Sequence, residues 1–307
     1  MYYFIVNPNS RSGKGALIWK ELRRTLRQKH VSYKAVFTEY RGHAVKLAAS
    51  VTAKASPEHP VYLIAVGGDG TIQEVLSGVK DLSCIYFGYI PTGSGNDFCR
   101  SMQLPQDPHE ALNCILKRKH IASMDVPVIS IKGRKSHFAI SCGIGFDAAV
   151  CHEVGVTPMK KVLNRVGLGK LVYLFVALKQ LLFLKPVPVT LRMDEERIYP
   201  FHKVYFAAVM NQKYEGGGYK FCHDASPSER YSHVIVVDGL SKLKVLFCLP
   251  TAFWGKHTQF TGIHIFRCKK VEVFSTVPLA VHKDGESAGI QETFSVSIEK
   301  EPVKIIL

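Results

Sequence analysis

One short run of residues constrains the fold more than any other. The run Gly67-Gly-Asp-Gly-Thr71 follows the apolar stretch 61–66, which is typical of a buried strand, and apolar residues at helical spacing predict a helix over 71–79. Three glycines around one carboxylate let the backbone approach a polyanion closely, and the first turn of a helix favours negative charge. The run therefore predicts a nucleotide-phosphate site in which Asp69 is placed to offer an oxygen to Mg²⁺.

The first 124 residues alternate between two kinds of pattern. Strand-like segments lie at 2–6, 32–38, 61–66 and 84–90, and helix-like segments lie at 16–29, 42–55, 71–79 and 108–117. Strands separated by helices of this length pair in parallel. We expect residues 1–124 to form an α/β nucleotide-binding domain with a doubly wound, mostly parallel sheet.

The pattern changes after Met124. Strand-like segments follow one another with few helices between them, at 125–131, 137–141, 187–193, 204–210, 232–237, 264–266 and 271–274. This spacing is typical of an antiparallel sandwich or barrel. We expect a β-rich second domain over 125–287, and a final strand at 294–306 that could return to either domain.

Two further loops follow strands of the first domain. The loop 7–15 offers Ser10, Ser12, Lys14 and backbone amides, which suit phosphate oxygens, although an ordinary capped turn would look similar. The loop 91–97 supplies Thr92, Gly93, Ser94, Gly95, Asn96 and Asp97. Ligands of open α/β sheets bind at the carboxyl ends of the strands, so we expect these loops and the run at 67–71 to meet in one crevice.

The segment His282-Lys-Asp-Gly-Glu286 places two carboxylates around a glycine between strand-like stretches. It reads either as an exposed hairpin tip with solvated acids or as a site whose carboxylate removes a proton from an attacking hydroxyl. The run Gly143-Ile-Gly-Phe-Asp147 lacks the context of a dinucleotide site and reads as a turn of the second domain.

The net charge of +15 bears on partners. Nucleic acid, an anionic bilayer and anionic cosubstrates all fit it, as does a solvated basic surface; nucleic acid fits least, because no binding motif for it is present. The strongly apolar segment 170–185 is too short to span a bilayer. It is either a helix packed on the second domain or, with Lys160, Lys161 and Arg165 upstream, an element that meets the membrane or admits a lipid tail.

Together these motifs resemble the bacterial diacylglycerol/lipid kinase family, which is related to sphingosine and ceramide kinases and more distantly to NAD kinase and phosphofructokinase. The matching residues are Asn7-Pro8 with Ser10, Gly13 and Lys14; Gly67–Thr71 with Glu74; Pro91–Asp97; Gly143–Asp147; and Asp284–Glu286. The run 91–97 separates the lipid kinases from NAD kinases.

The resemblance implies an ATP-binding α/β domain to which the C-terminal segment 288–307 returns, and a β-rich domain for the lipid. It implies ATP contacts from Asn7, Ser10, Lys14, Thr38, Gly67, Gly68, Asp69, Gly70, Thr71, Glu74, Thr92, Gly93, Ser94, Gly95 and Asn96. It further implies an acidic network of Asp69, Asp97 and Asp125 around Mg-ATP, and catalysis by Glu286 as the base with Asp284 and Asp69.

The expected activity is an ATP- and Mg²⁺-dependent lipid kinase of phospholipid metabolism that phosphorylates the hydroxyl of a membrane lipid such as diacylglycerol. We expect it in the cytoplasm, held peripherally at the inner membrane surface by its basic residues. A kinase of a soluble hydroxyl compound such as NAD, and a lipid- or nucleotide-binding regulator without catalysis, are the alternatives. The sequence leaves the lipid and the existence of a homodimer open.

One stretch departs from the family. Many members carry an Asp-Gly pair in the second domain that helps to hold a structural Mg²⁺, and here the stretch 223–232 lacks it. Glu229 could substitute, but Arg230 beside it would oppose a divalent cation. We therefore do not expect that structural metal.

Overall fold

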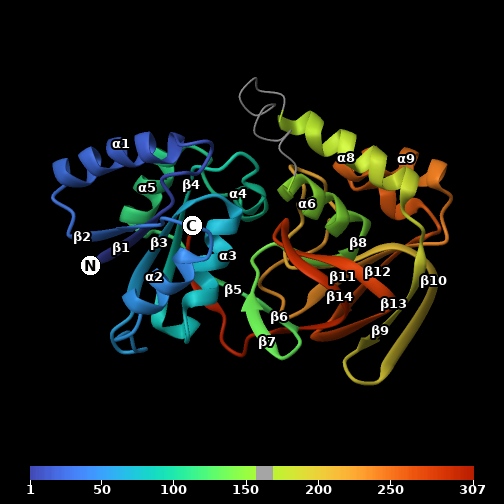
Figure 1. The fold of residues 1–307 in the computed structure, drawn as a ribbon. Helices are drawn as coiled ribbons and strands as arrows, with labels where there is room; N and C mark the ends of the chain where they lie inside the picture. The colour runs from blue at the N-terminus through green and yellow to red at the C-terminus, as the bar shows by residue number, and fades with distance from the viewer. Residues whose placement is uncertain (157–168) are drawn as a thin grey trace.

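The computed structural model describes residues 1–156 and 169–307, and it divides them between two sheets (Figure 1). The first sheet has the strand order β2-β1-β3-β4-β15-β5. Its strands are β1 (Tyr2–Val6), β2 (Tyr33–Phe37), β3 (Val61–Gly67), β4 (Ile85–Pro91), β5 (Ile121–Met124) and β15 (Val303–Ile306). Neighbouring strands pair in parallel except β15 and β5. The expected mostly parallel sheet is confirmed.

Helices cover both faces of this sheet. They are α1 (Lys14–Gln28), α2 (His43–Val51), α3 (Asp69–Gly78), α4 (Asp97–Met102) and α5 (Pro108–Lys117), with a short 3₁₀ turn, η1 (Leu82–Cys84). Buried residues of α1 and α5 share one core with β1 and β3, whereas α2 and α3 share the other core with β3 and β4. On α1 the buried residues Trp19, Leu22 and Leu26 recur at helical spacing. The domain is therefore doubly wound, as expected.

Helix α3 begins earlier than the sequence pattern indicated. We expected its start at Thr71, but it begins at Asp69, directly after Gly68 in extended conformation. An acidic residue in the first turn is favourable next to the positive end of the helix. The carboxylate of Asp69 is thus carried by the helix and not by the preceding loop.

The second sheet is antiparallel, with the order β12-β11-β10-β8-β13-β14-β6-β7 and with β9 paired to both β10 and β13. Its strands are β6 (Pro127–Ile131), β7 (Arg134–His137), β8 (Ser141–Gly145), β9 (Val187–Met193), β10 (Arg197–Met210), β11 (Ser232–Asp238), β12 (Ile263–Cys268), β13 (Lys270–Lys283) and β14 (Glu286–Ile298). The long strands β10 and β13 each pair with β8 over one part and with β9 over another, so the sheet closes over an apolar core. This confirms the β-rich sandwich or barrel.

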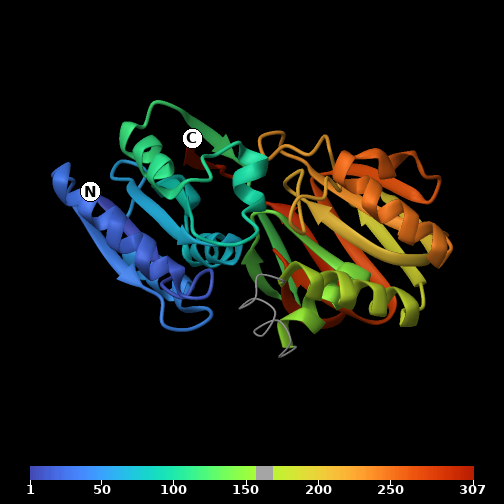
Figure 2. The same ribbon diagram turned by 90° about the horizontal axis from the view of Figure 1, so that it is seen from above.

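Helices cover the outer face of this sheet. They are α6 (Phe146–Val156), α8 (Gly169–Phe183) and α9 (Lys242–Thr251), followed by the 3₁₀ turns η2 (Ala252–Trp254) and η3 (Lys256–Gln259). They share a second apolar core with β10 and β11. Seen from above, the two domains lie end to end (Figure 2). Among the described residues, no helix has both the length and the apolar character needed to cross a membrane. Lys160, Lys161 and Arg165 lie outside the described residues.

The C-terminal segment differs from the expectation in one respect. The strand expected at 294–306 is two strands, because β14 ends at Ile298 and β15 begins at Val303. Strand β14 pairs with β13 and β6 in the second sheet, whereas β15 lies between β4 and β5 in the first. Residues 288–298 thus belong to the second sheet, and the return begins only after them.

Candidate active site

The three loops that follow β1, β3 and β4 are joined by hydrogen bonds. The hydroxyls of Ser10 and Thr92 lie 2.7 Å apart, and the Asn7 side-chain amide donates to the Thr71 hydroxyl over 3.3 Å. The backbone amide of Thr92 donates to the Gly67 carbonyl over 2.7 Å. Loops that are far apart in sequence therefore form one polar surface at the carboxyl edge of the sheet.

Glycine is required where these loops touch. A methyl group on Gly67 would lie 2.2 Å from the Thr71 hydroxyl oxygen, and one on Gly93 would lie 2.8 Å from the Cα of Gly68. Real side chains do not approach this closely without displacing the backbone. A methyl group on Gly95 would meet only an ordinary contact of 3.6 Å, to the Asp69 carboxylate. The glycines at 67 and 93 thus serve the packing of the loops themselves.

Asp69 fastens the third loop to α3. Its carboxylate accepts hydrogen bonds from the backbone amides of Asp97 and Phe98, over 3.1 and 3.4 Å, and so caps the first turn of α4. Burial and, to a smaller extent, the neighbouring charge of Asp97 raise the pKa of the Asp69 carboxyl to about 7. Each carboxylate oxygen keeps a second lone pair, so the group can still serve a cation once it is deprotonated.

Asp97 connects the two domains. It forms an ion pair with Arg100, and its second carboxylate oxygen accepts from the backbone amide of Gly217 over 2.7 Å. Gly217 lies in the loop after β10 of the second domain. The third loop therefore contacts both sides of the domain boundary.

The Asp125 carboxylate is bound by Arg230 of the second domain. Its carboxylate accepts from the backbone amide of Arg230 over 2.6 Å and pairs with the Arg230 guanidinium over 2.7 Å. The same guanidinium donates to the carbonyls of Glu299 and Lys300. Across 1–156 and 169–307, no group of three or more His, Cys, Asp or Glu side chains is placed to hold a metal ion. The structure thus does not gather Asp69, Asp97 and Asp125 into one set of ligands.

The acidic segment at 284–286 forms the turn between β13 and β14. Asp284 and Gly285 both have positive φ, 48° and 75°, as a tight two-residue hairpin requires. The Asp284 carboxylate is buried and accepts from the backbone amides of Ala139, Ile140 and Ser141 over 2.8, 2.8 and 3.0 Å. Burial raises the pKa of the Asp284 carboxyl. The tip is therefore anchored inside the molecule, and a hairpin tip with two solvated acids is not what forms.

Glu286 lies against the glycine run. A methyl group on Gly70 would come within 2.8 Å of its Oε1 atom, so the carboxylate sits over the first turn of α3. Its other oxygen pairs with the Arg41 guanidinium over 2.7 Å. The side chain is 38% exposed, which leaves it open to a substrate.

A cleft of about 400 Å³ adjoins Glu286. It is lined by Arg41, Gly42, Val45, Gln73 and Glu74 from the first domain and by Lys283, Glu286, Ser287 and Ala288 from the second. Glu74 does not point its charge freely into this cleft, because its oxygens accept from the backbone amides of Gly42 and Ala44 over 2.8 and 3.2 Å. It caps α2 and thereby places Arg41 beside Glu286.

The remaining predicted residues lie around the same edge. Thr38 is buried at the end of β2, where its amide donates to the Val6 carbonyl over 2.9 Å. Lys14 is exposed in the first turn of α1. Asn96 has a left-handed backbone (φ 52°) and accepts from the Tyr89 hydroxyl over 3.4 Å. Thus Thr38, Lys14 and Asn96 each follow a strand of the first sheet.

Sequence reasoning missed a buried polar cluster beside the hairpin. His282 is fully buried, with its Nε2 atom 2.9 Å from the Asp147 carboxylate and 3.5 Å from that of Glu215. The Ser141 hydroxyl also donates to Glu215. These carboxylates raise the pKa of His282 to about 9 against the opposing effect of burial, and burial raises that of Glu215 to about 7. Strand alternation could have marked His282 as inward-facing, but no signal in the sequence points to Glu215.

Comparisons with known proteins agree with this architecture. Residues 1–128 match the family model described as diacylglycerol kinase catalytic domain, and residues 141–306 match the YegS C-terminal NAD kinase beta sandwich-like domain. The Bacillus subtilis protein named "Putative lipid kinase YtlR" is 30% identical over 99% of this chain and 98% of its own. A Staphylococcus saprophyticus diacylglycerol kinase is 24% identical over 79% of this chain and 75% of its own.

Solved structures show the same fold. A Bacillus anthracis structure titled as a diacylglycerol kinase has a TM-score of 0.70 at 19% identity and covers 99% of this chain and 96% of its own. An NAD kinase from Archaeoglobus fulgidus in complex with ATP has a TM-score of 0.53 at 14% identity and covers 100% of this chain and 94% of its own. The resemblance inferred from the motifs is confirmed.

Proposed function

The chain belongs to the diacylglycerol kinase family, and from this premise we propose that it transfers the terminal phosphoryl group of ATP to the hydroxyl of a membrane lipid. One observation carries the proposal: Glu286, from the second domain, lies over the first turn of α3 beside the glycine run. A carboxylate beside a phosphate-binding surface is what transfer to a hydroxyl requires.

The three loops suit the phosphates of ATP. Gly68 before α3 offers no side chain to cap the helix, so the first turn of α3 suits anionic oxygens. The first amides of α1, those of Lys14, Gly15 and Ala16, donate instead to backbone carbonyls of the loop 8–11. The hydroxyls of Ser10, Thr71 and Thr92 and the amide of Asn7 converge on the same edge. We assign Thr38, Lys14 and the run 92–96 to the same ATP site.

Asp69 fits a magnesium ion that accompanies ATP. It is the carboxylate that stands between the second and third loops, and its pKa of about 7 allows it to ionise near neutral pH. When bound, Mg²⁺ supplies neutralisation of the phosphate charge. In this proposal Asp97 acts indirectly, because its carboxylate holds the third loop against Gly217 of the second domain.

The residues of the cleft would perform the transfer by positioning. Glu286 accepts the proton of the lipid hydroxyl as that oxygen attacks, and Arg41 and Lys283 line the cleft as cations that face the transferred group. Asp284 holds the hairpin, and with it Glu286, in place through three backbone hydrogen bonds. Its role is positioning, since its carboxylate is turned into the protein.

The test is labelled ATP with a panel of detergent-dispersed lipids and with NAD as a competing acceptor. The wild-type protein should label at least one lipid, and Glu286→Gln should lower kcat by about 10²- to 10⁴-fold while ATP binding stays unchanged. Glu292→Gln, a change on the same strand, is the matched control. Full turnover by Glu286→Gln would refute the role of the base. Label in NAD alone would favour the soluble-substrate kinase, and ATP binding with no transfer would favour a regulator.

A further inference from the structure

Large apolar side chains lie exposed on three neighbouring elements of the second domain. On α8 they are Phe175, Leu178, Leu182 and Phe183; on α9 they are Leu243, Leu246 and Phe247; on η2 they are Phe253 and Trp254. Their exposed fractions range from 38% for Leu246 to 76% for Phe183. Scattered single apolar residues are ordinary on a surface, but a cluster of this kind marks a contact with another phase or molecule.

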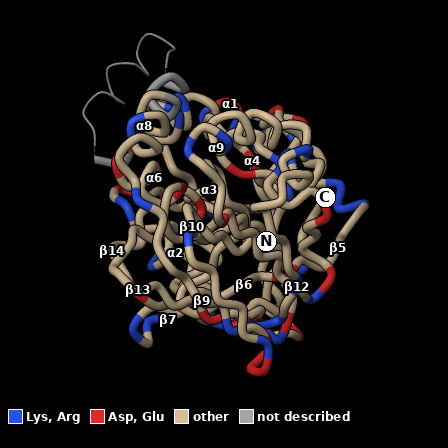
Figure 3. Tube along the Cα trace, turned by 90° about the vertical axis from the view of Figure 1, so that its right-hand side faces the viewer, with Lys and Arg blue, Asp and Glu red and all other residues tan. Residues whose placement is uncertain are grey.

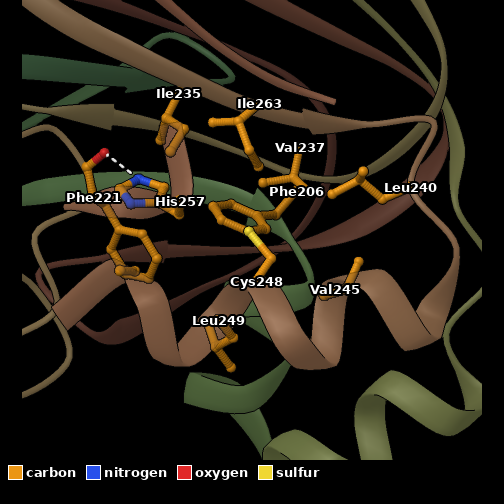
Figure 4. Close-up of a pocket in the computed structure, with 11 residues that line it drawn as sticks. Phe206, Phe221, Ile235, Val237, Leu240, Val245, Cys248, Leu249, His257 and Ile263 are labelled. Atoms are coloured by element: carbon orange, nitrogen blue, oxygen red, sulfur yellow. Dashed lines mark hydrogen bonds between the residues drawn. The ribbon is translucent and has the colours of Figure 1, made fainter. Parts of the chain in front are cut away.

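Helix α9 is apolar on both sides. Its inner residues Val245 and Cys248 pack over Phe206, Val237 and other residues of the sheet (Figure 4). Its outer stripe, formed by Leu243, Leu246, Phe247 and Pro250, recurs at helical spacing and faces solvent. A surface helix normally carries one apolar stripe that faces the core, so the second, outer apolar stripe of α9 is unexplained by the fold.

The space beneath α9 does not account for this face. The cavity between α9 and the sheet holds only about 20 Å³, which is room for about one water molecule and not for a lipid tail. The outer apolar stripe of α9 is therefore not explained by a lipid pocket beneath the helix.

The two helices form one surface. The Lys242 ammonium at the start of α9 donates to the Leu182 carbonyl at the end of α8, and Val176, Leu181 and Val245 share one core. Figure 1 shows both helices at one edge of the second domain. We call the exposed residues of α8, α9 and η2 the α8–α9 surface.

The segments that form this surface carry charged residues of one sign. The sequence contains no Asp or Glu at 154–193 or at 239–271, whereas Lys185, Lys244 and Lys256 are exposed there. Both helices carry lysine residues, drawn in blue in Figure 3. A second copy of this chain would bring the same positive charge and would be repelled, whereas anionic headgroups would be attracted. An exposed Trp beside Lys residues is also typical of the membrane–water interface.

The geometry points to the α8–α9 surface as the face by which this protein binds an anionic phospholipid bilayer. Phe183, Phe247 and Trp254 enter the boundary between headgroups and acyl chains, and Lys185, Lys244 and Lys256 contact the headgroups. The inference rests on the proposed function in one respect, because a lipid kinase must reach a substrate that stays in the bilayer.

A chain of contacts joins this surface to the candidate base. On α8, Lys179 and Gln180 donate to Glu153 of α6 over 2.7 and 2.6 Å. The next residue towards the N-terminus, His152, lies 2.8 Å from the hydroxyl of Ser287, which follows Glu286 in β14. Docking through the α8–α9 surface would thus fix α6, and with it the hairpin, close to the bilayer.

The test compares two matched pairs of exposed apolar residues. Phe247→Ser with Trp254→Ser changes the α8–α9 surface, at side chains 66% and 70% exposed, and Leu17→Ser with Ile198→Ser changes side chains 64% and 62% exposed elsewhere. Vesicles of phosphatidylglycerol and phosphatidylcholine are sedimented with each protein. We expect the first pair to lower the partition coefficient about tenfold or more, and the second to leave it within about twofold. Equal binding by both pairs would overturn the inference.

The charge is tested separately. Lys244→Gln with Lys256→Gln should weaken binding to the anionic vesicles about fivefold per charge at low ionic strength, with no change on pure phosphatidylcholine. The control is Lys132→Gln with Lys135→Gln, which changes two exposed residues, one in the turn between β6 and β7 and one in β7. A loss of the same size in the control pair would refute a defined surface, because it would show that net charge alone governs binding.

Two readouts separate this inference from the proposed function. The emission of Trp254 should shift to the blue when anionic vesicles are added, while Trp19, which is 5% exposed, gives a constant background. This holds whether or not the protein transfers phosphate. On a dissolved short-chain diacylglycerol the Phe247→Ser, Trp254→Ser protein should keep its turnover. A dimer in solution that this variant dissociates would overturn the inference in favour of a second copy.

Discussion

The two sides of the candidate active site are built in different ways. The first-domain side is a set of loops whose shape depends on glycines and on hydrogen bonds between neighbouring strands, such as Thr92 to Gly67. The second-domain side is a hairpin tip held by side chains from distant segments, such as Asp284 to 139–141 and His282 to Asp147. The shape of the first side depends on local backbone conformation. The shape of the second side depends on hydrogen bonds between residues that are far apart in the sequence.

The largest loss of stability is expected from a substitution on the second-domain side. Asp284→Ala removes the acceptor of three buried backbone amides, and each unsatisfied donor costs about 1–3 kcal/mol, so the loss of unfolding free energy should be about 4 kcal/mol. Asp284→Asn keeps one acceptor oxygen and should lose about half as much. Urea unfolding measures both. A loss below about 1 kcal/mol for Asp284→Ala would show that the hairpin does not need the hydrogen bonds of the Asp284 carboxylate.

A smaller effect is expected on the first side. Gly67→Ala forces a methyl group against Thr71, and overpacking of this kind costs about 1–3 kcal/mol. Gly95→Ala, where the new methyl group meets an ordinary contact, should change stability by less than about 0.5 kcal/mol. The midpoint of unfolding, followed by the fluorescence of buried Trp19, distinguishes them. Equal midpoints would mean that the loops accommodate a side chain at 67.

The smallest expected effect is a dependence of stability on pH, which arises from His282 on the second-domain side. The pKa of His282 is raised from 6.5 to about 9, so the folded state holds its proton more tightly than the unfolded state does. This contribution is complete below pH 6.5 and is lost as pH rises through about 9. The pKa values of Glu215 and Asp69 are raised from 4.5 and 3.8 to about 7, so most of the stability that they cost on ionising is lost by pH 7.

We therefore expect the melting temperature to fall by about 5 °C between pH 7 and pH 9. His282→Gln should lower the melting temperature throughout but flatten this slope, since it removes the titrating group. His120→Gln, a change at a surface residue, should leave the slope intact. A slope that survives in His282→Gln would assign the pH dependence to other groups.

The difference between local and long-range contacts also explains which features the sequence could predict. The glycine run, the loops at 7–15 and 91–97 and the Asp-Gly turn each follow from residues within a short window, because strand, turn and helix propensities are local. The anchoring of Asp284 and the pairing of His282 with Glu215 join residues 67 or more positions apart, and no local pattern encodes them. The Arg230 side chain on Asp125 spans 105 positions. Its effect on a cation could be foreseen from its charge, but its partner could not.

The position of β15 has a consequence for how the protein is made. Residues 303–306 supply an inner strand of the first sheet, and β5 has its only pairing with that strand among those described. While a ribosome is still translating the second domain, the first sheet lacks this strand, and β4 and β5 carry unpaired edges. The first sheet can therefore be completed only after residue 306 has left the exit tunnel. A chain that stops between residues 299 and 302 would carry every described strand of the second sheet but an incomplete first sheet.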